Sequence, residues 1–355
     1  MSTNKSIMTK EVKVRFIASL GIVIIMIIAA VTGLSCGNQK SGEIKSEGPV
    51  KLRIEQDEAA GILTVFRQGG NDPIVTQIAE QDHRPFLHPI VAPDGKGELT
   101  EYSPGHHKHQ TGLYWGFTRV NGQTSVSKDI LNEWFYNPDK PEAIARAIGR
   151  DYFHHYQGDS WRRESFSVVQ AEGESVSWQT VYSMLDESGN VIMTETQNWT
   201  MQEVDGKFFL DLEWLGEAIE EITIGEFEYG GLFIRMPWRK GINGRAVNAA
   251  GQVDQQAEGQ QSEWVDVGMQ VEGRNDLAHI AIFDHPSNGG FPQTWRIDDQ
   301  LGVGPVRART GDWKIEKGNT ETIRHRIVAF THDLSDIELN ELWKEYTGNH
   351  NSDDL

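Results

Sequence analysis

The stretch Leu210-Asp211-Leu212-Glu213-Trp214 alternates apolar and acidic residues over the length of one β-strand. Successive side chains of a strand point to opposite faces, so this pattern predicts a strand with one buried and one solvated face. The stretch 176–184 alternates in the same way, with Val176, Trp178 and Tyr182 on one face. Residues 186–190 then predict a turn into another strand. The expected local structure is therefore a series of antiparallel strands joined by tight turns.

Similar short runs recur along the chain, at 61–68, 73–79, 230–236 and 279–283. The 36 glycines suit a β-protein with many turns and bulges. Only 140–149 and 335–346 have a helical pattern, and Ser335 can cap the second of these, where Leu339, Leu342 and Trp343 share a face. We therefore predict an all-β fold, in which residues 50–355 form one large antiparallel β-sandwich, a single domain with a short C-terminal helix.

The N-terminal segment has the pattern of an export signal. Four basic residues precede an apolar run from Phe16 to Leu34, which Ser35-Cys36-Gly37 follows. This order is typical of a lipoprotein signal peptide, so we expect residues 1–35 to be removed, Cys36 to carry lipid and the polar residues 36–49 to be a flexible tether. The protein would then be exported and lipid-anchored to a bacterial membrane, in the periplasm or at the cell surface. The alternative is an uncleaved membrane anchor, since the run is long enough to span a bilayer.

Charge and cysteine content exclude several classes of function. The formal charge is −19 over 355 residues, and −22 without residues 1–35. Such a body repels phosphate backbones and anionic lipids, so we expect no nucleic-acid partner, membrane contact only through the lipid, and a monomer. One cysteine forms neither a disulfide framework nor a zinc ribbon within the chain. Gly302-Val303-Gly304-Pro305 lacks the third glycine of a dinucleotide-binding motif.

Histidines gather in groups, and the densest group lies between Gly105 and Gly112. In an extended segment His107 and His109 point to the same face, which suits either a base with its neighbour or two metal ligands. Residues of other groups, His88 and His154, can complete such a site. We predict these four histidines to be catalytic, with either no cofactor or a divalent metal ion held by His107 and His109. The alternative for each is a histidine on the surface without a role.

Several motifs resemble the PmoA-like family. They are Arg84-Pro85-Phe86-Leu87-His88-Pro89, His107-Lys108-His109-Gln110-Thr111-Gly112-Leu113, Val120-Asn121-Gly122, Gly230-Gly231-Leu232-Phe233-Ile234-Arg235, Ile282-Phe283-Asp284-His285-Pro286-Ser287-Asn288 and Trp295. The resemblance covers most of residues 50–332 and implies an exported bacterial β-sandwich associated with carbohydrate use. We predict that residues in these motifs, and Trp115 in the apolar run that follows the second one, contact substrate: Gln110, Trp115, Arg235, His285 and Trp295.

Members of the family are commonly labelled methane oxygenase subunits, a label that we reject. That subunit is a polytopic membrane protein, and this sequence has one apolar run. The sequence also departs from the family pattern, with Glu228-Tyr229 in place of a Lys-Glu pair, and with His106 and Thr111 where an acid and an arginine are usual.

A local reversal of charge lies between Arg146 and Arg163. This segment combines arginines and histidines with aromatic residues. Arginine forks bind carboxylate or sulfate, and aromatic rings stack on sugar rings. We predict that Arg150 and Arg162 bind an acidic oligo- or polysaccharide. The alternative is a solvated face whose arginines pair with Asp151, Asp159 and Glu164.

Together these residues favour β-elimination, by a lyase or a dehydratase, on a saccharide that contains uronic acid. Such a reaction needs a base for the proton α to the carboxylate, a cation beside the carboxylate and an acid for the leaving oxygen. The histidines can serve as base, Tyr156 as acid and the arginines as cation. Two alternatives remain open: a glycoside hydrolase with a pair of carboxylates, and a surface lipoprotein that binds carbohydrate without catalysis.

We predict that Cys36→Ser abolishes the incorporation of labelled lipid and leaves the fold intact, because the chain has a single cysteine. Metabolic labelling with a radioactive fatty acid, together with the circular dichroism of the variant, measures both effects. Labelling that persists in the variant would contradict the lipoprotein signal.

Overall fold

The computed structural model describes residues 48–105, 107–123, 126–127, 129–131, 133, 142–154 and 160–348. Contacts divide the chain into two units, Met1–Lys45 and Ser46–Leu355, and the fold given below is that of the second. Cys36 and the apolar run before it lie outside the described residues. Among the helices that the structure describes, none has the length and apolar character needed to cross a membrane.

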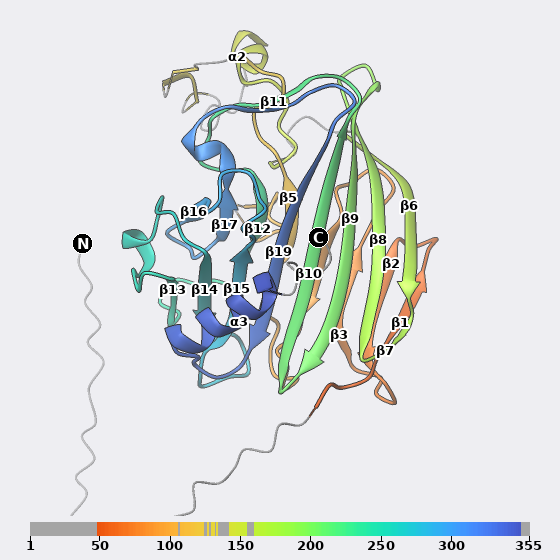
Figure 1. The fold of residues 1–355 in the computed structure, drawn as a ribbon, viewed down its shortest axis with the longest axis vertical. Helices are drawn as coiled ribbons and strands as arrows, with labels where there is room; N and C mark the ends of the chain where they lie inside the picture. The colour runs from red at the N-terminus through yellow and green to blue at the C-terminus, as the bar shows by residue number, and fades with distance from the viewer. Residues whose placement is uncertain are drawn as a thin grey trace, which may run out of the picture. The chain divides into compact units, whose positions relative to one another are not determined.

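The second unit is built from two large antiparallel sheets (Figure 1). The nine-stranded sheet has, in order, β16 (Thr294–Ile297), β17 (Val303–Val306), β12 (Gly231–Ile234), β5 (Leu113–Gly116), β4 (Phe86–Ile90), β3 (Pro73–Ile78), β2 (Ile62–Arg67), β1 (Leu52–Asp57) and β7 (Glu172–Gly173). The eight-stranded sheet has β13 (Gly244–Asn248), β14 (Trp264–Met269), β15 (Ala278–Asp284), β19 (Thr320–Phe330), β10 (Lys207–Ala218), β9 (Val191–Val204), β8 (Ser175–Leu185) and β6 (Trp161–Gln170).

Shorter elements complete the unit. A separate pair of strands is formed by β11 (Ile222–Ile224) and β18 (Trp313–Ile315). Among the elements with described bounds are the helices α2 (Glu142–Ile148) and α3 (Asp336–Gly348) and the 3₁₀ turns η1 (Asp254–Gln256) and η2 (Arg307–Thr310). Both helices coincide with the two stretches that have a helical pattern in the sequence.

The alternation in β10 works as predicted. Leu210, Leu212 and Trp214 are buried in the core between the sheets. On the opposite face Asp211 and Glu213 form cross-strand ion pairs with Arg326 and Arg324 of β19, at 2.6 and 2.9 Å. The register is thereby fixed by apolar burial on one face and by charge pairing on the other. The predicted antiparallel β-sandwich with a short C-terminal helix is confirmed.

Helix α3 covers the outer face of the eight-stranded sheet. Its Leu339 and Tyr346 are buried in a cluster with residues of β14, β15 and β19. At its start, the Ser335 hydroxyl and the Glu338 carboxylate bond reciprocally to each other's backbone N–H groups, at 3.3 and 2.8 Å. This capping box satisfies donors that a helix start leaves unpaired.

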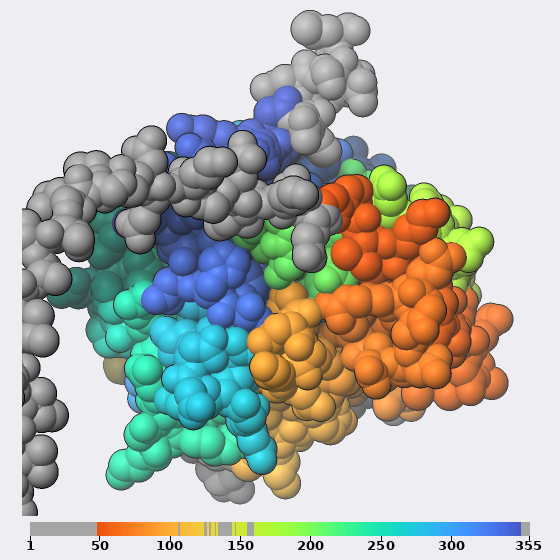
Figure 2. Space-filling view, turned by 90° about the horizontal axis from the view of Figure 1, so that it is seen from below, coloured from red at the N-terminus to blue at the C-terminus, as the bar shows by residue number. Residues whose placement is uncertain are grey.

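Two loops on one edge of the sandwich are joined by a buried arginine. The Arg274 guanidinium bonds Asp94 at 2.6 Å and Asp276 at 2.7 Å. Figure 2 shows the gold segment near residue 100 and the cyan segment near residue 275 side by side on this face. The first segment belongs to the loops of the nine-stranded sheet and the second to those of the eight-stranded sheet, so the Arg274–Asp94 contact ties the two sheets together, while Asp276 holds the guanidinium from its own loop.

One carboxylate lies inside the core. Glu195 of β9 is 1% exposed and accepts a hydrogen bond from the Gln197 amide at 2.8 Å. Burial raises the pKa of Glu195 from its ordinary 4.5 to about 7. Because this pKa is higher in the folded than in the unfolded chain, the contribution of Glu195 to the free energy of unfolding is complete below pH 4.5. It is lost as the pH rises through about 7.

In the unmodified protein, Glu195 should lower the free energy of unfolding by roughly 3 kcal/mol as the pH rises from about 4.5 to 7. We therefore predict that this contribution to the pH dependence is absent in Glu195→Gln. Denaturant unfolding at several pH values measures it. A smaller slope remains in the variant, because burial also raises the pKa of Asp284 to about 7. Glu217→Gln, at an exposed position of β10, is the matched control. Equal slopes in the variant and the unmodified protein would contradict this role for Glu195.

Candidate functional site

The outer face of the nine-stranded sheet carries a second apolar cluster, separate from the main core. Phe86, Tyr114 and Phe233 are cross-strand neighbours on β4, β5 and β12. Their rings form this cluster together with the ring of Phe153. The residues next to them in sequence, among them Leu87, point into the core between the sheets. Strand alternation thus gives this sheet an aromatic outer face on which loops can pack.

Arg84 joins strand β5, the segment that carries His154 and the loop that carries His109. Its guanidinium is fully buried, lies 3.9 Å from the Tyr114 ring centroid and donates to the carbonyl groups of Tyr152, Phe153 and His109. The segment that carries His154 and the loop that carries His109 are therefore held by the same cation. A buried guanidinium without such acceptors would be strongly destabilising.

A glycine allows the His154 segment to approach the sheet. The backbone of Tyr152 and Phe153 donates to the Phe117 carbonyl at 2.8 and 3.0 Å. A Cβ at Gly116 would lie 2.6 Å from the Tyr152 carbonyl oxygen, a distance that a side chain cannot adopt. The missing side chain at the end of β5 is thus a condition for the position of His154.

Asp151 shapes the turn before His154 and orients its ring. One carboxylate oxygen accepts from the backbone N–H groups of Phe153 and His154 at 3.1 and 2.9 Å. The other lies 2.8 Å from Nδ1 of the His154 ring. Because a carboxylate accepts, this contact assigns a proton to Nδ1, so that in the neutral ring Nε2 is the acceptor nitrogen. An imidazole in this state can act as a general base.

Of the two predicted histidines of loop 102–111, His109 lies beside His154 and His107 lies beside His109. The ring centroids of His109 and His154 are 4.7 Å apart, and those of His107 and His109 are 5.8 Å apart. Burial, the neighbouring His154 and the guanidinium of Arg84 hold the pKa of His109 far below its ordinary value. His109 is therefore a neutral imidazole at neutral pH, and the structure does bring together three of the four predicted histidines.

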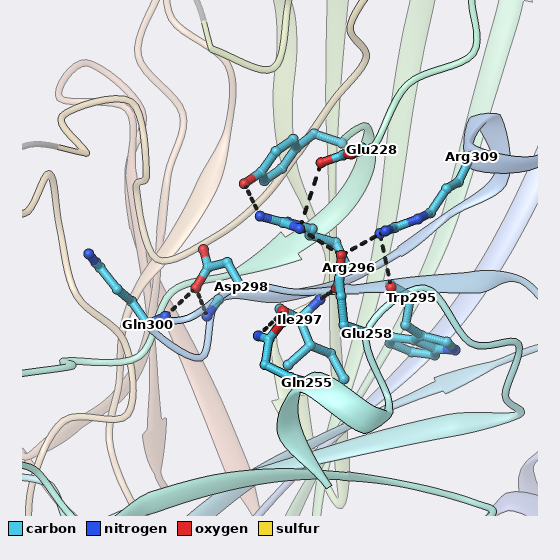
Figure 3. A network of polar contacts seen from close by, with 11 residues as sticks. Glu228, Gln255, Glu258, Trp295, Arg296, Ile297, Asp298, Gln300 and Arg309 are labelled. Carbon is cyan, nitrogen blue, oxygen red and sulfur yellow. Dashed lines mark hydrogen bonds and ion pairs between the residues drawn. The ribbon is translucent and has the colours of Figure 1, made fainter. Parts of the chain in front are cut away.

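Tyr229 completes the cluster from another segment. Its ring centroid is 5.7 Å from that of His154. Its hydroxyl accepts from Nη2 of Arg296 at 2.8 Å, and Nη1 of Arg296 bonds Glu258 at 2.6 Å. Figure 3 shows Arg296 in this network, between Glu258 and the more distant Glu228 at 3.7 Å. Burial raises the pKa of Tyr229 to about 12, although the charge of Arg296 opposes the rise, so the hydroxyl keeps its proton at neutral pH.

Arg235 fixes the base of loop 102–111. Its backbone bonds Gly112 and Glu101, which flank the loop, both at 2.9 Å. Its side chain donates to the Gln110 side chain and forms a buried ion pair with Asp298 at 3.0 Å. The predicted contacts Gln110 and Arg235 thus lie at the foot of the histidine loop, where both are buried and hold it in place.

The structure corrects three of the predicted substrate contacts. The Trp115 ring is buried between the sheets and stacks on Trp214 at 4.8 Å. Trp295 is also in the core, where its Nε1 donates to the Ser262 carbonyl at 2.8 Å. His285 is buried against Tyr346 of α3, on the opposite side of the sandwich. Strand alternation assigns the two tryptophans to the inner face, so they pack the core.

The predicted arginine site is also corrected. Arg150 bonds Glu187 at 3.0 Å, and Arg162 of β6 bonds Glu164 at 2.8 Å. These contacts correspond to the alternative in which the arginines pair with acids on a solvated face. Arg162 lies on β6, in the eight-stranded sheet, whereas Arg150 lies on the segment that carries His154 and bonds the backbone of Val120.

The remaining predictions have different outcomes. His88 lies on the outer face of β4, with Nδ1 3.0 Å from the Thr100 hydroxyl and its ring 5.9 Å from that of Tyr102. Tyr156 lies outside the described residues. Among the residues that are described, no three His, Cys, Asp or Glu side chains form a group that could hold a metal ion.

Two residues of the cluster, Asp151 and Tyr229, were not predicted. Asp151 was counted only as an acid that could neutralise an arginine. Its position three residues before His154, typical of a side chain that accepts from the backbone of the next turn, was the available signal. Tyr229 is far from the histidines in sequence, and only the pairing of β12 with β5 brings them together.

Comparisons with known proteins give a family. The model of a family described as "Family of unknown function (DUF6807)" matches residues 66–344. The chain belongs to this family. The match includes β4, β5 and β12 and therefore every described residue of the histidine cluster. A search of curated proteins found no match.

Solved structures with some likeness in fold share very little sequence. A GH36 α-galactosidase from Geobacillus stearothermophilus has 6% identity and a TM-score of 0.41, over 79% of this chain and 41% of that one. A galactose mutarotase related enzyme from Lactobacillus acidophilus has 9% identity and a TM-score of 0.31, over 80% and 98%. A polysaccharide lyase has 9% identity and a TM-score of 0.33, over 83% and 34%. The chain thus spans less than half of the α-galactosidase and of the lyase.

We predict that the His109 ring of this DUF6807 protein stays neutral as the pH falls through 6.5, the ordinary pKa of histidine. Two-dimensional NMR of the labelled imidazoles measures this, and the same ring in the denatured chain is the control. Because the unfolded chain takes up the proton first, His109 makes the fold less stable below that pH. A His109 signal that titrates near pH 6.5 in the folded protein would contradict the arrangement of the cluster.

Proposed function

We propose that this protein acts on carbohydrate and catalyses β-elimination on a saccharide that contains uronic acid. The observation that carries the proposal is the convergence of a carboxylate-oriented imidazole, His154, with a neutral second imidazole and a protonated phenol, Tyr229. This set includes a base and an acid, which are the two proton-transfer groups that elimination needs.

The proposed step moves one proton to the enzyme and one proton to the leaving group. Nε2 of His154 takes the proton at C5, α to the carboxylate, and the released electron pair forms the C4–C5 double bond. The C4–O bond breaks, and the Tyr229 hydroxyl gives its proton to the departing oxygen. The resulting phenolate lies beside Arg296. Transfer of the proton from His154 to Tyr229, directly or through water, restores the starting state.

Positive potential at the cluster supports this step. Arg84 and Arg235 act on His109, and Arg296 acts on Tyr229, each in the direction that lowers the pKa of the group. Arg235 and Arg296 are paired with Asp298 and Glu258, respectively. Arg84, which bonds carbonyl groups, is therefore the cation of the three that can stabilise the negative charge developing on the substrate carboxylate in the transition state. All three guanidinium groups are held in place by hydrogen bonds before any substrate arrives.

Glycoside hydrolysis is the second candidate, because two carboxylates flank one residue of the cluster. Glu258 and Glu228 lie 2.6 and 3.7 Å from Nη1 of Arg296. However, Glu258 also bonds Arg309 at 2.7 Å and accepts from the backbone of Ile297, so its oxygens are engaged in holding this network together. The fixed His154 therefore favours elimination. We also propose, from the sequence alone, that the protein is similar to the PmoA-like family and that Cys36 carries a lipid anchor.

We predict that His154→Gln and Tyr229→Phe each lower the rate of elimination by about 100- to 10,000-fold, as expected for loss of a general base or acid. Full-length protein is incubated with acidic polysaccharides, and the ultraviolet absorbance of the unsaturated uronate is followed. His332→Ala, at an exposed position after β19, is the control. New reducing ends without this absorbance would favour hydrolysis, and binding without new products would favour a non-catalytic protein.

A further inference from the structure

A cavity of about 330 Å³ opens beside loop 102–111, outside the histidine cluster. It lies at the small end of the range of ligand cavities, about 300–1,000 Å³, and suits a single sugar unit better than a long chain. The cavity is lined by the segment after β12, by the start of the loop and by the β16–β17 turn. The lining residues are Glu101, Pro104, Gly105, Arg235, Trp238, Arg239, Lys240 and Gln300.

The charge of this lining is opposite to that of the protein. Three lining residues are cationic and only Glu101 is acidic, whereas the whole chain has a formal charge of −19. Arg235 is already neutralised by Asp298 at the base of the cavity. Arg239 and Lys240 are exposed at its rim, where Arg239 contacts Glu101 at 2.5 Å. The rim therefore offers an arginine and a lysine to an incoming anion.

An aromatic ring accompanies these cations. Trp238 is half-buried, with part of its ring against the core and part in the lining of the cavity. A flat apolar ring beside cationic groups suits an anionic sugar, whose ring can stack on the indole while its oxyanion meets the guanidinium. A simple inorganic anion has no apolar face that could stack on the indole.

The cavity and the histidine cluster share one loop. Pro104 and Gly105 line the cavity, and His107 and His109 of the same loop lie in the cluster. The loop closes on itself through bonds from Ser103 to Gln110 at 2.7 Å and from His107 to Pro104 at 2.6 Å. Its base is held by Arg235, which also lines the cavity. A ligand in the cavity would therefore be a neighbour of the groups proposed to do the chemistry.

We propose that this cavity is a subsite for one carboxylated sugar unit, with Arg239 and Lys240 binding the carboxylate and Trp238 stacking on the ring. The inference rests on the proposed function, since it names the substrate class of the same site. Its test, however, measures binding alone.

The test compares the affinity of full-length protein and variants for three probes: oligogalacturonides, neutral galactan oligosaccharides, and sulfated galactan oligosaccharides without carboxylates. Isothermal titration calorimetry at physiological salt is suitable, because close ion contacts are screened less than the long-range repulsion by the acidic body. We expect Arg239→Glu/Lys240→Glu to weaken oligogalacturonide binding about 10- to 100-fold, as for lost charge-assisted hydrogen bonds. Trp238→Ala should weaken the oligogalacturonide and, to a smaller extent, the neutral probe.

The matched control is Arg162→Glu/Lys314→Glu, which makes the same charge change at side chains that are 47% and 51% exposed, outside the cavity. It should leave the affinity for oligogalacturonides nearly unchanged. Equal losses in both double variants would overturn the proposal, as would tighter binding of the neutral or the sulfated probe. If the cavity variants lose affinity as expected but the unmodified protein eliminates none of the acidic saccharides, the subsite is supported and the proposed reaction is contradicted. If elimination depends on His154 while the cavity variants bind normally, the reaction stands and the subsite fails.

Discussion

The buried guanidinium of Arg84 is the interaction on which the rest of the cluster depends. It lies two residues before β4, stacks on a tyrosine of β5 and donates to carbonyl groups of two segments that are distant in sequence. Removing a guanidinium from water is costly unless its donors find acceptors. Those acceptors are backbone groups of Phe153 and His109, so the requirement of one cation positions the two imidazoles next to it.

The other arginines of this face have a related arrangement. Arg235 and Arg296 are paired with Asp298 and Glu258, respectively, and each also bonds a side chain of the site. Paired charges of this kind add little net attraction for a distant ligand, but they set directions for the groups that they touch. The recognition of an anion is then left to the exposed cations at the rim of the cavity, which are Lys240 and Arg239, the latter shared with Glu101.

The sequence was most informative where burial repeats at a fixed period. Alternation at 210–214 and 176–184 gave the strands, and the capping pattern at Ser335 gave the last helix, because these are local preferences. Which face of a strand looks into the core depends on the partner sheet. For this reason the sequence predicts Trp115 and Trp295 to contact substrate, whereas both rings pack the interior.

The site was predicted in part for the same reason. His107 and His109 share a loop, so their spacing alone suggested a pair. His154, which was also predicted, joins them through Arg84, and Tyr229 joins through the pairing of β5 with β12. Neither contact leaves a trace in local spacing. In the arginine-rich segment, the pairing of Arg162 with Glu164 was one of the two sequence-based alternatives, whereas Glu187 is too distant in sequence for its contact with Arg150 to be predicted.

Gly116 has a consequence for how this surface would respond to mutation. The His154 segment packs on main chain where a side chain is missing, and a methyl group there would overlap the Tyr152 carbonyl. A conventional alanine scan removes atoms and reads importance from what is lost. At this position the same substitution adds atoms, so the scan would measure an intrusion into the interface. On this face of the sheet, a residue with no side chain is among those that tolerate replacement least.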